Sequence, residues 1–315
     1  MKIGRFAGVT DTGRRRMRNE DTLVIRPPLF AVADGMGGAK AGEIAARLAA
    51  SALEEAGTGV EGEQGVAALI EEANRRIWER AVADPATAGM GTTVTAALVD
   101  AQSAAVAIGH VGDSRAYLLR GETFAQLSTD HSLVAELVQS GVLTPEEAER
   151  HPQRSAITRA LGTDAAVDVE VQTIEGQVGD LFVLCSDGLS VMLGDEEIVA
   201  AIEGAGREPQ AAGDALVAAA NTRGGEDNIT VVLFELVDGE PEPPQLDAGS
   251  DPSGQTPSGG TGTDSRSDPT GLTSSEPSAD VRTHGAGPGG RLTSLALVAL
   301  AIAVGLLALY WGISR

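Results

Sequence analysis

The stretch LFAVADGMGG, residues 29–38, decides how this sequence folds and what it can bind. Its first five residues are apolar, which is typical of a short buried strand. Asp34 follows the apolar run directly, and the glycines after it let the backbone approach another group closely. A carboxylate beside bare backbone carbonyls suits a hard cation that takes oxygen ligands. The alternative is a plain strand, turn and helix in which Asp34 is only a capping residue.

Four other places in the sequence repeat this design, with an acidic residue at or beside the end of an apolar strand. Several carboxylates that converge from distant segments favour bound divalent cations, because clustered like charges otherwise repel or take up protons. Oxygen ligands favour Mg²⁺ or Mn²⁺, whereas four scattered His and a single Cys argue against a zinc site. The four places are Glu20-Asp21, Asp113, Asp187-Gly188 and Asp227-Asn228.

The composition narrows the classes of function. The formal net charge is −22, so we expect no nucleic-acid partner, because binding phosphates of nucleic acid requires basic patches. Cys185 is the only cysteine, so no disulfide can form within the chain, and its apolar neighbours predict a buried, inert thiol. Aromatic residues make up 3% of the chain, so the core should consist mainly of Ala, Val, Leu and Ile.

Strands and helices come in blocks rather than in strict alternation. Many of the connections between strands are too short for crossover helices, which favours antiparallel pairing. The pattern therefore predicts an α+β domain built on antiparallel sheets, not a doubly wound parallel fold. We expect strands at residues 3–10, 22–26, 29–33, 92–99, 103–111, 114–119, 123–127, 167–174, 181–185 and 228–236, and helices at 41–56, 64–83, 195–202 and 209–220.

The chain divides into three parts by composition. Residues 1–237 predict one globular domain, and residues 238–290, rich in Pro, Gly, Ser, Thr and Asp, predict a disordered linker. Within residues 291–315, the stretch 292–312 is uncharged and almost wholly apolar, long enough for one transmembrane helix as a C-terminal anchor. Residues 1–10 show no signal-peptide pattern, so we expect a single-pass protein of the cell membrane whose N-terminal domain lies in the cytoplasm.

Seven motifs make the chain resemble the metal-dependent protein phosphatases of the PP2C (PPM) family, in their bacterial serine/threonine branch. The resemblance covers residues 1 to about 237 and implies a four-layer αββα sandwich, in which helices flank two antiparallel sheets and metals bind at one edge. The motifs, in family order, are Arg16-x-x-Asn19-Glu20-Asp21, Asp34-Gly35-Met36-Gly37-Gly38, Gly91-Thr92-Thr93, Val111-Gly112-Asp113-Ser114-Arg115-Ala116-Tyr117, Asp130-His131-Ser132, Ser186-Asp187-Gly188-Leu189 and Asp227-Asn228.

The resemblance implies a site for two Mn²⁺ or Mg²⁺ ions. Asp34 would bridge both ions, and Asp187 and Asp227 would complete the ligands of one. Glu20 and the backbone carbonyl of Gly35 would serve the other ion, partly through waters. A water that bridges the two ions would attack the phosphate, because two such ions activate water and neutralise the developing charge.

Other residues are assigned supporting roles by the same resemblance. Arg16 matches the arginine that holds the substrate phosphate, and its planar fork suits that task, although a solvated loop charge is the alternative. Asp113 matches the aspartate of a third, weaker ion. Asp21 and Asn228 would orient the ligands without binding an ion themselves.

One position departs from the family's eukaryotic pattern. Met36 stands where eukaryotic members have a histidine that is a proposed general acid, and methionine cannot donate a proton. His131 is a candidate for that role, but a structural histidine hydrogen-bonded near Asp130 is the stronger interpretation. His110 lies in an apolar strand, where we expect it to pack.

The favoured hypothesis is a membrane-tethered phosphatase that hydrolyses phosphoserine and phosphothreonine on proteins and opposes membrane Ser/Thr kinases. Its partners would be phosphorylated proteins, kinases among them, and its catalytic domain would be monomeric. A non-catalytic binding module and a hydrolase of small phosphate esters are the alternatives. Substrate choice would depend on the surface of residues 125–161, which we expect to include a mobile flap.

Overall fold

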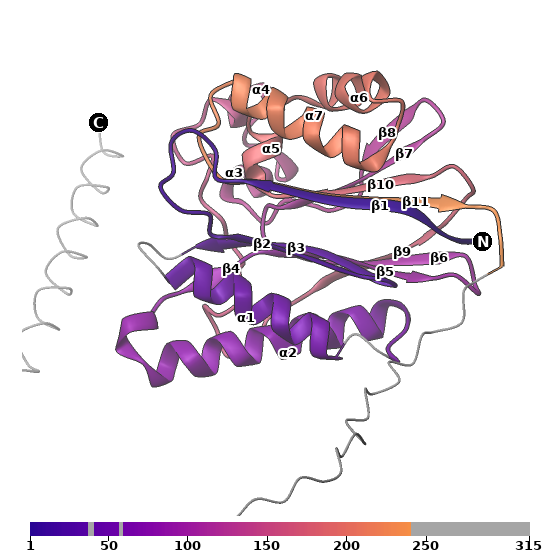
Figure 1. Ribbon diagram of the computed structural model, residues 1–315. Helices are drawn as coiled ribbons and strands as arrows, with labels where there is room; N and C mark the ends of the chain where they lie inside the picture. The colour runs from indigo at the N-terminus through magenta and orange to yellow at the C-terminus, as the bar shows by residue number, and fades with distance from the viewer. Residues whose placement is uncertain (37–40, 57–58, 241–315) are drawn as a thin grey trace, which may run out of the picture. The chain divides into compact units, whose positions relative to one another are not determined.

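A computed structural model of the protein describes residues 1–36, 41–56 and 59–240. Within them, two antiparallel sheets pack face to face, with helices on both outer faces (Figure 1). The predicted αββα sandwich is confirmed. No helix among these residues is long and apolar enough to cross a membrane, and the predicted anchor and linker lie outside the described residues.

The two sheets draw their strands from distant parts of the chain. All neighbouring strands run antiparallel, as the short connections predicted. The first sheet has the order β1 (Lys2–Asp11), β11 (Ile229–Val237), β10 (Leu181–Cys185), β7 (Arg115–Arg120) and β8 (Thr123–Gln126). The second has the order β2 (Asp21–Arg26), β3 (Leu29–Met36), β5 (Val94–Asp100), β6 (Ala105–Val111) and β9 (Glu170–Glu175), and β4 (Gly91–Thr92) pairs with β3.

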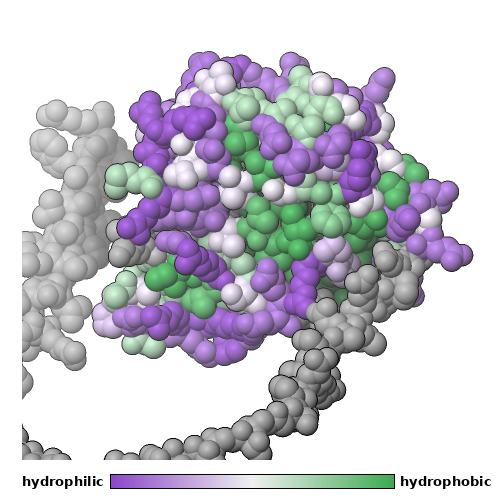
Figure 2. Space-filling model, viewed as in Figure 1, coloured by the Kyte–Doolittle hydropathy of each residue, from purple (hydrophilic) through white to green (hydrophobic). Residues whose placement is uncertain are grey.

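The helices form the outer layers. Two long helices, α1 (Ala41–Ala56) and α2 (Gly62–Ala83), cover the second sheet, and α6 (Asp195–Gly204) and α7 (Pro209–Thr222) cover the first (Figure 1). On the face shown in Figure 2, the surface over α1 and α2 is mostly hydrophilic, and hydrophobic residues gather toward the middle. The shorter helices are η1 (Pro85–Thr87), α3 (Leu133–Gln139), α4 (Pro145–Glu149) and α5 (Asp187–Ser190).

Small aliphatic residues fill most of the core, as the composition predicted. The layer between the second sheet and its helices is rich in alanine, which lets α1 and α2 pack closely. Three phenylalanines lie between the sheets, where Phe234 stacks on Phe30 and Phe182 with ring centroids 4.3 and 4.9 Å apart. Cys185 is buried and free, also as predicted.

The strand that carries Asp34 is longer than its apolar run suggested. We predicted that it ends at residue 33, but β3 continues to Met36 because Gly35 and Met36 pair with β4. The backbone of Asp34 is held there by two threonines: Thr92 Oγ1 donates to its carbonyl, and its N–H donates to Thr93 Oγ1. Asp34 is therefore fixed inside a sheet rather than in a free turn.

Candidate metal and phosphate site

Five aspartates from distant segments meet at one edge of the sandwich. Asp21 and Asp34 face each other across β2 and β3, while Asp187 begins α5 just after β10 and Asp227 precedes β11. Asp113 follows β6. The fold thus brings together the carboxylates that the sequence analysis singled out.

The electrostatics of this edge show how strongly the carboxylates interact. Burial raises the pKa of Asp34 well above its usual value, and the negative charges of the other four aspartates raise it further. Burial likewise raises the pKa of Asp21 to about 6 and that of Asp113 to about 7, with Asp187 adding to both. Such crowding is unfavourable unless protons or cations neutralise the charges.

Two oxygens at this edge lack a partner. Asp21 Oδ1 and Asp187 Oδ1 are buried and accept no hydrogen bond from the described residues. The other oxygen of Asp21 accepts hydrogen bonds from Ser186 at 2.8 Å and Thr230 at 2.7 Å, which fixes this carboxylate. A carboxylate set with unpaired oxygens fits hard divalent cations. Among the described residues, no three His, Cys, Asp or Glu side chains lie where together they could hold a metal ion, so the ligand assignments remain predictions.

Glu20 and Gly35 lie together, as the prediction of a shared ion requires. A side chain on Gly42, at the start of α1, would come within 2.7 Å of both Glu20 Oε2 and the Gly35 carbonyl oxygen. Gly35 itself has no room for a Cβ, because the backbone of Gly42 occupies that space. The close packing of these glycines places the Glu20 carboxylate beside the Gly35 carbonyl.

Arg16 lies at the edge of the carboxylate cluster. Its Nη2 donates to Asp227 Oδ2 at 2.6 Å, and about half of its side chain is exposed to solvent. Burial opposes the charge of Arg16, but Asp227, Glu20 and Asp34 outweigh that effect and raise its pKa. A charged, partly exposed guanidinium beside the cluster can hold an anion.

Asn228 ties the segment before β2 to the site. Its Nδ2 donates to the carbonyls of Thr12 and Arg18 at 2.9 and 2.8 Å, and its Oδ1 accepts from the Glu20 N–H at 2.8 Å. This single side chain therefore positions both ends of the loop that carries Arg16. The supporting role predicted for Asn228 agrees with these contacts.

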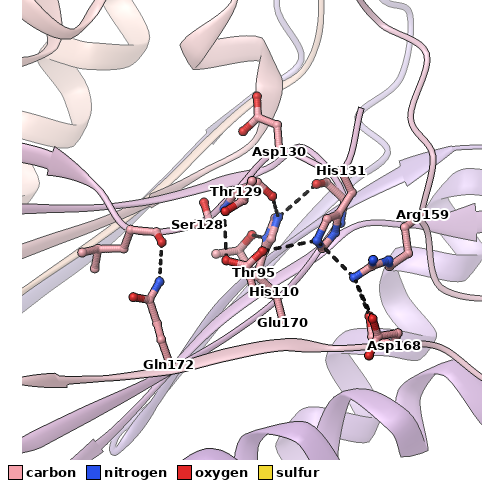
Figure 3. A network of polar contacts seen from close by, with 12 residues as sticks. Thr95, His110, Ser128, Thr129, Asp130, His131, Arg159, Asp168, Glu170 and Gln172 are labelled. Carbon is pink, nitrogen blue, oxygen red and sulfur yellow. Dashed lines mark hydrogen bonds and ion pairs between the residues drawn. The ribbon is translucent and has the colours of Figure 1, made fainter. Parts of the chain in front are cut away.

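Two stacked histidines hold the loop that leads to Asp113 (Figure 3). His110 Nε2 lies 3.0 and 3.1 Å from the carbonyls of Gly112 and Thr129, so this nitrogen carries the proton. Burial lowers the pKa of His110 to about 3, with further lowering by His131, which keeps the ring neutral. The expectation that His110 packs is correct, but its hydrogen bonds to the loop were not foreseen.

His131 also hydrogen-bonds to Gly112. Its backbone N–H donates to the Gly112 carbonyl at 2.7 Å, and its Nδ1 accepts from the Gly112 N–H at 3.0 Å. The ring proton therefore lies on Nε2, which faces Glu170 Oε2 at 3.3 Å beside Arg159 (Figure 3). The structural interpretation of His131 fits these contacts, although its partners are Gly112 and Glu170 rather than Asp130. Asp130 instead pairs with Arg115 at 2.7 Å.

A cavity of about 1100 Å³ opens beside Asp113 and Asp187. Residues of α3 and α4 line it, together with residues of the segment that follows Asp187. Apolar side chains such as Val134, Val138 and Val191 line it together with charged ones. The sequence predicted that residues 125–161 form a surface near the site, but not that residues 190–194 complete it, since no local pattern marks that contact.

Comparisons with known proteins identify the class of protein to which this αββα sandwich belongs. A family model for protein phosphatase 2C matches residues 17–217. A serine/threonine phosphatase of Listeria innocua, stp, is 40% identical over 238 residues, which cover 72% of this chain and 93% of that protein. The chain belongs to the protein phosphatase 2C family and is a serine/threonine protein phosphatase.

Solved structures show the same architecture. The crystal structure of the Mycobacterium tuberculosis serine/threonine phosphatase PstP/Ppp superposes with a TM-score of 0.71 at 38% identity, covering 75% of this chain and all of that one. A structure of the PstP catalytic domain in complex with two manganese ions has a TM-score of 0.69 at 36% identity, covering 75% of this chain and 99% of that one.

Proposed function

We propose that this phosphatase hydrolyses phosphoserine and phosphothreonine with two Mn²⁺ or Mg²⁺ ions held by Asp34, Asp187, Asp227, Glu20 and the Gly35 carbonyl. The observation that carries the proposal is the meeting of five aspartates with two unpaired buried oxygens. The ions, when bound, would activate water at neutral pH and offset the charge of the phosphate. The solved PstP catalytic domain in complex with two manganese ions supports the number and kind of ions in this proposal.

The chain's own side chains position the substrate in this proposal. Arg16 leaves its pairing with Asp227 to hold the phosphate through its planar fork, which suits two phosphate oxygens at once. Asp113, fixed by the two histidines, is available for a third ion. His131 is committed to Gly112 and Glu170, and Met36 has no proton to give, so we assign protonation of the leaving oxygen to water.

The peptide on one side of the phosphorylated residue would lie in the cavity beside Asp113 and Asp187. The apolar residues of α3 and the charged residues that line this cavity allow contacts with both apolar and charged side chains of the peptide. A folded substrate that presents an exposed loop fits such a cavity better than a small ester does, because a small ester leaves the walls uncovered. This favours phosphoproteins over small phosphate esters.

The first test measures phosphate release by the full chain in mild detergent from a phosphothreonine peptide. We expect release with Mn²⁺ or Mg²⁺ and none with EDTA, because the carboxylates alone repel the phosphate. kcat/KM should be higher for the peptide than for p-nitrophenyl phosphate, which serves as the control for hydrolysis of small esters. A folded protein that releases no phosphate with either metal would instead be a binding module.

The anchor is a proposal that rests on sequence. We propose that residues 292–312 span the cell membrane once and keep the catalytic domain in the cytoplasm, near the membrane kinases that it opposes. The phosphatase domain would act as a monomer on the end of the linker.

Truncation after residue 237, where β11 ends, tests this anchor. We expect the full chain in the membrane pellet after alkaline carbonate washing and the truncated chain in the supernatant, with equal kcat/KM on a peptide. Deletion of residues 238–290 alone is the matched control and should leave the protein in the pellet. A truncated protein that still pellets, or a full chain that does not, contradicts the proposal.

A further inference from the structure

The loop between β1 and β2 has an unusual concentration of positive charge. Four of five consecutive residues, from Arg14 to Arg18, are arginines in a chain whose formal net charge is −22. All five are exposed, and Met17 among them is 96% exposed. The loop projects at the left edge of the sandwich in Figure 1, and the corresponding surface in Figure 2 is mostly hydrophilic. Only one of these arginines, Arg16, is predicted to hold the substrate phosphate.

The backbone of this loop is fixed against the site. The N–H groups of Arg14 and Arg15 both donate to the Gly225 carbonyl, at 2.7 and 3.2 Å. Gly13 has a φ of 79° and leaves no space for a Cβ against the Asp227 carbonyl. Together with the hydrogen bonds from Asn228, these contacts tie the loop along its length to the segment that carries Asp227. Its arginines are therefore held at the edge of the phosphate site.

The arginines differ in the partners available to them. Arg16 pairs with Asp227 at 2.6 Å, and Arg14 has Asp11 at 3.9 Å. Within the part of the chain that the structure describes, Arg15 and Arg18 form no ion pair. Two exposed arginines thus flank, in the sequence, the residue that is proposed to bind phosphate.

We propose that Arg15 and Arg18 form a second anion subsite, which binds a carboxylate or a second phosphate close in sequence to the phosphorylated residue of the substrate. The inference rests on the proposed function, because Arg16 sets where the target phosphate lies. An extended peptide advances about 3.3 Å per residue, so a long arginine side chain reaches an anion within a few residues of that phosphate. The attachment of the loop to the Asp227 segment favours a substrate peptide over a lipid headgroup as the ligand.

The energetics make this subsite a determinant of specificity rather than of turnover. Exposed ion pairs contribute modestly each, but two of them together change kcat/KM by about tenfold. They are also screened by salt, because the charges are more exposed than those inside the site. Substrates with acidic or doubly phosphorylated segments would therefore be preferred at low ionic strength.

The experiment compares three phosphothreonine peptides that differ only in their flanks, with the full chain in mild detergent. One carries aspartates, one a second phosphoresidue and one alanines, and hydrolysis at the threonine is followed by mass spectrometry. In Arg15→Gln/Arg18→Gln, we expect the ratio of kcat/KM for either anionic peptide to that for the alanine peptide to fall about tenfold. Loss of the ratio for only one anionic peptide identifies which anion the subsite takes.

A matched variant controls for net charge. Arg75→Gln/Arg80→Gln removes two exposed arginines from α2, on the outer face of the sandwich, and should leave the ratio unchanged. Raising salt from about 50 to 500 mM should reduce the wild-type ratio, because the Debye length shortens severalfold.

Three results overturn the subsite. One is a wild-type ratio near one while all peptides are hydrolysed. Another is an equal ratio in wild type and the Arg15/Arg18 variant. The third is weaker sedimentation of that variant with phosphatidylserine vesicles and no change in the ratio, which assigns the arginines to lipid. Hydrolysis of no peptide by the wild type is distinct from these results, because it removes the proposed function and the subsite together.

Discussion

Replacing Asp34 with asparagine is expected to lower kcat/KM for a phosphothreonine peptide by about a thousandfold or more, the equivalent of roughly 4 kcal/mol. The same change should raise the melting temperature of the protein in EDTA. Asp34 lies among four other carboxylates, and without cations each negative charge there destabilises the folded state. Activity and metal-free stability therefore move in opposite directions, which simple damage to the fold cannot produce.

Calorimetry in EDTA and in Mn²⁺, beside steady-state kinetics, checks both effects. The wild type should gain stability when Mn²⁺ is added, and Asp34→Asn should gain much less, because one bridging ligand is lost. Asp214→Asn, an exposed carboxylate on α7, is the matched control and should change neither quantity appreciably. Turnover near the wild-type value would rule out a bridging role for Asp34, and a lower melting temperature in EDTA would contradict the charge repulsion among the carboxylates.

Helices and strands were predicted well wherever the segment itself has a clear hydrophobic pattern. The helix predicted at residues 41–56 and the strand at 181–185 coincide with α1 and β10, because strong apolar patterns define both. β3 shows the limit of such reasoning. Its last residues are a strand only because β4, more than fifty positions later, offers hydrogen-bond partners, and no local pattern contains that information.

The site also combines features that local sequence predicts with features that only tertiary packing creates. Motif spacing was enough to predict that Asp34, Asp187 and Asp227 come together, and the structure places them at one edge. Motif spacing could not predict that His110 and His131 both hydrogen-bond to Gly112. The two side chains are about twenty residues apart in the sequence and meet only through tertiary packing. The unpaired oxygen of Asp21 was equally hidden. The sequence predicts which residues come together, and packing decides what holds them in place.

Replacing Arg120 with alanine is expected to destabilise the domain by about 3 kcal/mol. Asp180 is only 1% exposed, and both of its oxygens accept from Arg120, at 2.8 and 2.6 Å. Arg120 also donates to the Glu175 carbonyl at 2.7 Å, so it joins the end of β7 to the connection between β9 and β10. Without Arg120, a buried carboxylate loses its counter-charge.

The matched control is Arg5→Ala in β1, whose pairing with Glu235 in β11 is only slightly longer at 2.9 Å but mostly exposed on the arginine side. We expect it to cost much less stability than Arg120→Ala, because water replaces the lost contact. For a domain of this size, Arg120→Ala should then lower the melting temperature by roughly 6–12 °C, and Arg5→Ala should lower it clearly less. Adding Asp180→Asn to Arg120→Ala should recover part of the loss, because it removes the unpaired charge. Equal losses from the two arginines, or no recovery in the double variant, would mean that burial of Asp180 does not set the cost.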